Sequence, residues 1–265
     1  MNQKIQNRLS GIEGISWDTD QYPQIQCSLN LKESMKHEFQ KGLNVQILCK
    51  SEGEQNPRDF EAAVFDALNF CFFENQEMAI CTKWRETSPM VLENDIQIKK
   101  MDMLFDVMIF QKQLEQEQNP VGTLNQWLKT LYGNIKIPGE DSLGETWKKD
   151  ADVPVVYSRL ESIVPGTYPD TWDTSWLMAG IRIHVIGDYP ERTFYIKEIS
   201  QRLAKIKQLK MKDGGPLFIH RINYNDTMNP LKNRQFFIEC QYGVLKEEVL
   251  AEPIRNVQIQ EETYE

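Results

Sequence analysis

The 265-residue sequence lacks long apolar segments. No run reaches the ~18 apolar residues that a membrane-spanning helix requires. Residues 1–14 also lack the apolar centre of a secretory signal peptide. We therefore expect a chain that is made and folds in a cytoplasm.

The sequence also lacks the common catalytic motifs. None of the patterns G-x-S-x-G, H-E-x-x-H, G-x-G-x-x-G and G-x-x-x-x-G-K-[ST] occurs. Residues 213–216 are rich in glycine, but they connect a predicted helix to a predicted strand, whereas a phosphate-binding loop leads from strand to helix. We predict a turn there, and we expect the chain not to be an enzyme.

Two short runs place carboxylates beside a tryptophan, at residues 17–20 and 172–174. A glycosidase can use such an arrangement, because an aromatic ring desolvates one of its two acids. Carboxylates two positions apart in a loop are, however, common in turns. We assign neither run a catalytic role and predict no cofactor.

Cysteine and histidine are too few and too scattered for a metal site. The five cysteines form no C-x-x-C pair, which favours buried free thiols over a disulfide framework. Four are predicted on strands and Cys71 at the end of a helix. Of the three histidines, His37 is predicted to be exposed. His184 and His220 are predicted on strands that could be neighbours, but no spaced cysteine or carboxylate joins them, so we predict no metal.

An excess of positive charge is absent as well. The 30 Lys and Arg residues are outnumbered by 39 Asp and Glu residues, which gives a formal net charge of −9. This composition argues against a groove that grips nucleic-acid phosphates. It suits a surface that must not adhere to DNA.

What the sequence does contain is a β-α unit in residues 180–206. Apolar residues alternate from position 181 to position 185, as in a strand with one face buried. After a turn at residues 187–190, apolar residues recur at steps of three and four, as on one face of a helix: Ile196, Ile199, Leu203 and Ile206. Such a unit cannot bury its faces alone.

The same order of elements is predicted twice. The first series comprises a helix at 2–10, strands at 23–29 and 43–49, a helix at 57–70, and strands at 78–84 and 101–110. The second comprises a helix at 124–131, strands at 152–160 and 181–186, a helix ending near 206, and strands at 217–222 and 234–240. Pro23 and Pro154 stand near the start of corresponding strands.

We therefore predict an α+β protein with two tandem copies of a small unit. Each copy has a helix, a mostly antiparallel sheet of about four strands and a packed helix. The predicted boundaries are 1–122 for the first copy, including a Gln/Glu-rich linker at 111–122, then 123–250 for the second and 251–265 for an acidic tail.

Long polar stretches interrupt both copies. They lie at residues 30–42, 85–100, 161–175 and 223–233, and we expect them to contact neighbouring subunits or partners. Trp147, Trp172 and Trp176 fall in predicted polar loops. Their rings either lie at subunit interfaces or pack back on the protein's own sheet.

The second copy resembles bacteriophage tail terminator and tail-completion (neck) proteins. The resemblance lies in PVVYSRLE at 154–161, in residues 180–206, and in NRQFFIECQYGV at 233–244. That family opens with a short helix and a proline-led strand, and closes on a strand preceded by a basic residue, here Arg234. The resemblance covers most of 124–245 and, more faintly, 2–110. The doubled length is similar to the terminators of contractile-tailed phages.

The resemblance implies a virion structural protein assembled in the host cytoplasm. It implies a homohexameric ring at the head-proximal end of the tail, which caps the tube and sheath and docks the neck. DNA would pass through the lumen without sequence-specific binding. Two alternatives remain: another phage part, such as a neck, head-completion or baseplate protein, and a small-molecule enzyme with its site between two domains.

Overall fold

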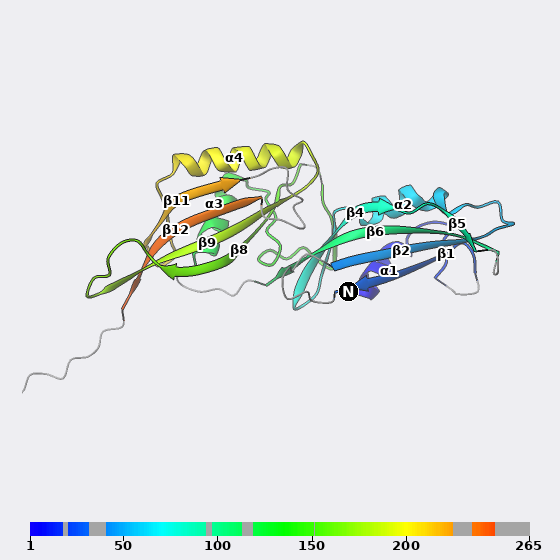
Figure 1. Ribbon diagram of the computed structural model, residues 1–265, viewed down its shortest axis with the longest axis horizontal. Coiled ribbons are helices and arrows are strands. Elements are labelled where there is room, and N and C mark those ends of the chain that lie inside the picture. Colours follow the sequence, from blue (N-terminus) through cyan, green and yellow to red (C-terminus); the bar gives the residue numbers. More distant parts are fainter. Residues whose placement is uncertain are drawn as a thin grey trace, which may run out of the picture.

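Two antiparallel sheets follow one another along the chain and lie end to end in an elongated molecule (Figure 1). The computed structural model describes residues 1–17, 21–31, 41–93, 97–112, 119–150, 152–224 and 235–246. Helices pack on one face of each sheet. The predicted α+β class is confirmed.

The first sheet has the strand order β1-β2-β6-β4-β3-β7, and β5 pairs with β6. Its strands are β1 (Gln24–Asn30), β2 (Lys41–Lys50), β3 (Cys71–Glu74), β4 (Met78–Thr87), β5 (Val91–Glu93), β6 (Ile98–Gln111) and β7 (Thr146–Lys148). The helices on it are α1 (Asn2–Leu9) and α2 (Glu61–Leu68), with the 3₁₀ turn η1 (Pro57–Phe60) before α2. They bury Ile5, Leu9, Val64 and Leu68 against alternate residues of the strands.

The second sheet has the strand order β10-β11-β12-β9-β8. Its strands are β8 (Val155–Pro165), β9 (Thr174–Ile186), β10 (Gln208–Lys210), β11 (Pro216–Tyr224) and β12 (Phe236–Leu245). The helices α3 (Pro120–Leu131) and α4 (Glu191–Lys205) cover one face. On α4, Ile196, Ile199 and Leu203 are fully buried, as the helical spacing predicts.

Five strands of each sheet are arranged in the same way. The order β1-β2-β6-β4-β3 in the first sheet corresponds to β8-β9-β12-β11-β10 in the second, when strands are matched in chain order and the short strands β5 and β7 are left out. All these pairs are antiparallel. Both β4 and β11 also have a register shift against the strand beside them, β6 and β12 respectively. The two halves therefore share topology beyond the order of elements along the chain.

The same two backbone contacts precede the first strand of each half, β1 and β8. Ser16 donates its N–H to the Pro23 carbonyl (2.9 Å) and forms a parallel bridge to the start of β1. Lys136 donates to the Pro154 carbonyl (2.9 Å) and forms a parallel bridge to the start of β8. The two prolines thus occupy equivalent places.

A third apolar cluster joins the two sheets. It takes Phe72 and Phe110 from the first sheet, and Val155, Tyr157 and Ile186 from the second. Strand β7, which lies beyond residue 122, pairs with β3 and brings Trp147 into this cluster. The halves therefore share buried contacts and one sheet edge.

Several predicted boundaries are wrong, for local reasons. The helix predicted at 57–70 ends at Leu68, and Cys71 begins strand β3 instead of closing the helix. The end of the predicted linker belongs to α3, because Asn119 caps the helix by accepting the Gly122 N–H, and Pro120 suits the first turn.

The stretch predicted as a polar excursion at 161–175 is strand at both of its ends, and residues 166–173 form the loop between them. Polar side chains do not prevent pairing when one face of a strand points to water, and β8 continues to Pro165 against β9. Other predicted features lie outside the described residues, either wholly or in large part: the carboxylates at 18–20, the segments 32–40 and 225–234, His37, Arg234 and the tail from 247 onward.

Candidate assembly surface

Exposed apolar side chains gather on the hairpin of β8 and β9, which projects at the left end of Figure 1. We call this group the hairpin surface; it consists of Leu160, Ile163, Val164, Tyr168 and Trp172. Trp172 is 88% exposed, the most exposed of the large apolar side chains in the described part of the chain. Exposed apolar side chains that gather on one element are candidates for an interaction surface.

The loop that carries Trp172 is held by hydrogen bonds at both sides. Gly166 N–H donates to the Trp176 carbonyl (2.7 Å), and the Thr167 hydroxyl donates to Gln241 Oε1 (2.7 Å). Lys246 Nζ donates to the Thr171 carbonyl (2.6 Å). Trp172 therefore projects from a fixed support, which lowers the entropy lost when an interface forms.

The loop tryptophans divide between the two interpretations that the sequence leaves open. Trp147 is on β7 and its ring centroid lies 5.3 Å from that of Phe72, inside the protein. Trp176 is on β9 and packs edge-on against Tyr168 at 5.1 Å. Trp172 alone of the three points to solvent. It is the candidate interface residue.

A second exposed apolar group lies at the opposite end of the molecule, where β4 leads into β5. It comprises Met90, Val91 and Leu92, all of which fall within the predicted contact stretch 85–100. The exposed hydrophobic residues thus concentrate in segments that the sequence suggests as contact regions.

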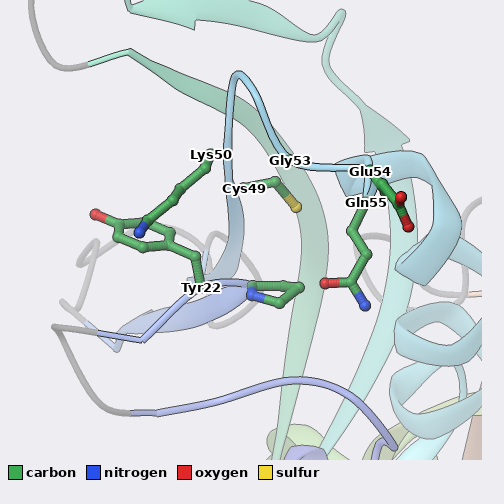
Figure 2. Close-up of a pocket in the computed structure, with 7 residues that line it drawn as sticks. Tyr22, Cys49, Lys50, Gly53, Glu54 and Gln55 are labelled. Atoms are coloured by element: carbon green, nitrogen blue, oxygen red, sulfur yellow. The ribbon is translucent and has the colours of Figure 1, made fainter.

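At this same end the β2–η1 turn forms a small open pocket, which the sequence did not predict. Its volume is about 330 Å³, near the lower limit for pockets that hold small ligands. Figure 2 shows Tyr22 and Lys50 on one side, Glu54 and Gln55 on the other, and Cys49 between them. Lys50 Nζ lies 5.9 Å from the centre of the Tyr22 ring, within the range of a cation–π contact.

The carboxylates beside Trp172 do not have the properties of a general acid. The backbone N–H of Trp176 and the Ser175 hydroxyl bond to Asp170 and lower the pKa of its carboxyl. The Thr171 hydroxyl does the same for the pKa of Asp173. A glycosidase acid needs the opposite shift. These two carboxylates act as hydrogen-bond acceptors that shape the loop.

The strands of the two histidines, which the sequence allows to be neighbours, are not adjacent in the sheet. Strand β12 separates β9, which carries His184, from β11, which carries His220. His184 is fully buried between the sheets, with its ring 6.2 Å from that of Tyr157, whereas His220 lies near Tyr168 on the surface. Within the described ranges, no group of three or more His, Cys, Asp or Glu side chains could hold a metal ion.

The cysteines are free thiols, as the sequence predicts. Cys49, Cys71, Cys81 and Cys240 are buried, and Cys27 is partly exposed. Burial raises the pKa of Cys49 and of Cys71 to about 11, and that of Cys240 to about 12. Such thiols are poor nucleophiles at neutral pH.

Among the described residues, no helix is long and apolar enough to span a membrane. No protein-family model matches the sequence, and no curated protein matches it significantly. The function must therefore be inferred from the sequence pattern, the repeated topology and the exposed surfaces.

Proposed function

We propose that this chain is a tail terminator of a contractile-tailed phage. As a homohexameric ring it caps the head-proximal end of the tail tube and sheath and joins them to the neck. The observation that carries the proposal is the doubled unit, in which five strands follow one order in both halves. Tandem duplication of one terminator-like unit accounts for that order and for the matching prolines Pro23 and Pro154.

The exposed surfaces support an assembly role. Apolar groups lie on the hairpin surface and at the β4–β5 end, at opposite ends of an elongated molecule. A subunit with two different surfaces can join its neighbours head to tail, and such contacts produce a ring when the rotation closes. The function is then steric: the ring offers one face to the tube and another to the neck.

The charge suits a channel for DNA. A net charge of −9 disfavours adhesion to phosphates, so DNA passes through the lumen without sequence-specific binding. In this proposal the chain needs no cofactor and performs no chemistry. Its partners are further copies of itself, the tube and sheath proteins, and the connector proteins of the neck.

The test is assembly with purified tail tubes, viewed by electron microscopy. We expect the chain at one end of each tube, with elongation stopped there. Binding to purified head–neck complexes and not to tubes would instead favour the neck or head-completion alternative. Failure to bind either, with thermal stabilisation by a metabolite, would favour the enzyme alternative, because a bound ligand stabilises the folded state.

A further inference from the structure

Lysine side chains cluster where α4 ends and the edge strand β10 begins. We call this group the lysine surface; all of its side chains are exposed, and it consists of Lys205, Lys207, Lys210 and Lys212. No Asp or Glu occurs between Glu198 and Asp213. Arg202, one turn earlier, is already paired with Glu198 at 3.1 Å and is not included. In a chain with a net charge of −9, the lysine surface is a local field of the opposite sign.

The ordinary structural roles of lysine account for only part of this surface. Lys205 is in the last turn of α4, where a cation complements the helix dipole. Lys210 is on β10, and a lysine on an edge strand discourages pairing with other chains. Lys207 and Lys212 are on neither element. In the described part of the chain, Lys205, Lys207 and Lys210 form no ion pair, so their charges are open to a carboxylate or phosphate.

The chain itself contains a segment of opposite charge. Residues 247–265, which lie outside the described residues, hold one arginine and six glutamates, a net charge of −5. More than half of the excess negative charge of the chain is therefore in this segment. The glutamates stand near both of its ends, at positions 247, 248, 252, 261, 262 and 265.

The segment leaves the fold close to the lysine surface. Strand β12 ends at Leu245. In the adjacent strand β11, Leu217 pairs with Tyr242 of β12, and the preceding residue, Pro216, pairs with Lys210 of β10. The end of β12 and the β10–β11 turn therefore lie at the same end of the sheet, two strands apart (Figure 1). With strands about 4.8 Å apart and about 3.3 Å per residue, position 247 is roughly 15 Å from Lys210.

One chain can therefore supply the carboxylates for its own lysine surface. An unfolded stretch as long as residues 247–265 has an end-to-end distance of roughly 24 Å, which exceeds the gap to Lys210. A segment attached in this way has an effective concentration on the order of 1 mM at a site within its reach. Free copies at micromolar concentration cannot compete with it. Contact within one chain is thus favoured over contact between copies.

We propose that residues 247–265 dock on the lysine surface of the same chain. The glutamate carboxylates bind the ammonium groups, and Lys207, Lys210 and Lys212 are the central contacts. The proposal is independent of the proposed function, because it concerns a single chain. It adds a means of keeping DNA off the lysine surface, since carboxylates occupy the places that phosphates would otherwise take.

The test is cross-linking of the full-length protein with a carbodiimide, which joins a lysine amine directly to a glutamate carboxyl that touches it. An equal mixture of unlabelled and isotopically labelled protein shows by mass spectrometry whether a link lies within one copy. We expect links from residues 247–265 to Lys207, Lys210 or Lys212 without light–heavy pairs. Lys50, which is exposed at the opposite end of the molecule, is the matched control and should not be linked. At about 1 M salt, where the Debye length is ~3 Å, the links should be lost.

Two results would overturn the proposal. Links found only between a light and a heavy copy would place the segment on a second copy. No excess of links to the lysine surface over links to Lys50 would mean that the segment does not dock there. In that case, retention of a short DNA duplex by the wild-type chain at low salt would assign the surface to phosphates instead.

A second measurement is the rate at which an N-hydroxysuccinimide ester acetylates each lysine. The variant carries Glu→Gln at positions 247, 248, 252, 261, 262 and 265, which removes the negative charge and leaves the described fold unchanged. An ammonium group in an ion pair reacts slowly, so Lys207 and Lys210 should react about 2- to 5-fold faster in the variant, as expected for exposed ion pairs. The rate at Lys50 should stay the same. Equal rates at Lys207 and Lys210 in the two proteins would contradict the proposal.

Discussion

The ring of Tyr157, on β8, lies edge-on to the ring of Phe110, on β6, with their centroids 5.0 Å apart. Both residues are buried, and they belong to different sheets. This contact sits in the cluster that joins the two halves. Because the halves share a buried core region, we expect them to unfold together.

Phe110→Ala tests that coupling. Removing a fully buried phenylalanine should lower the free energy of unfolding by about 3–5 kcal/mol. Backbone amides in both sheets should lose protection against hydrogen exchange, because the apolar cluster contains residues of both sheets. Phe194→Ala, at an exposed site, should change stability by less than about 1 kcal/mol. Loss of protection in the first sheet alone would contradict the coupling.

An ion pair at the same junction leads to a pH prediction. Lys149, just after β7, donates to Glu191 at the start of α4, with Nζ–Oε1 at 2.7 Å. Burial raises the pKa of Glu191, and the bonds from Lys149 only partly offset this. The folded state therefore holds this proton more tightly than the unfolded state. Because of this tighter binding, the proton on Glu191 stabilises the folded state. The stabilisation is fully present below the pKa of Glu191 in the unfolded chain, and it is lost as the pH rises through the pKa of Glu191 in the folded protein.

The measurement is the free energy of unfolding of wild type and of Glu191→Gln across the acidic range. Between about pH 4 and about pH 7, wild type should lose stability relative to the variant, which cannot ionise at this position. A relative gain over that range would show that Lys149 outweighs burial and would contradict the assignment.

The thiols supply a prediction about reactivity. A pKa near 11 instead of 9 reduces the thiolate fraction of Cys49 and Cys71 by about 100-fold at neutral pH. An alkylating reagent should therefore modify Cys27 first in the folded protein, because Cys27 is the partly exposed one. All five cysteines should react in denaturant. Mass spectrometry of quenched time points gives the order, and equally fast labelling of Cys240 would contradict the described burial.

Hydrophobic periodicity predicted the long elements well. The helix α4 and the strands around Ile181, Ile183 and Val185 were evident because burial of one face imposes a regular spacing. The short strands β3, β7 and β10 were missed, since three or four residues are too few to establish a period. Their place in the sheet is decided by tertiary pairing, as for Trp147 of β7 beside Phe72.

The candidate surface was predictable only in part. The stretches 85–100 and 161–175 were expected to make contacts, and they carry exposed apolar side chains such as Leu92 and Trp172. The sequence could not place the pocket, because Tyr22 and Gln55 come from loops that only the folded sheet brings together. It also could not tell that β12 separates His184 from His220, since strand order depends on long-range pairing.

The central claim is that this chain forms a ring on the end of a tail tube. The most direct measurement is the mass and symmetry of the particle that it forms with purified tubes, by native mass spectrometry and electron microscopy. The account predicts a six-fold ring of six 31.0-kDa chains, or 186 kDa, at one tube end. A chain that stays monomeric or forms a closed dimer, while the tubes remain uncapped, would contradict it.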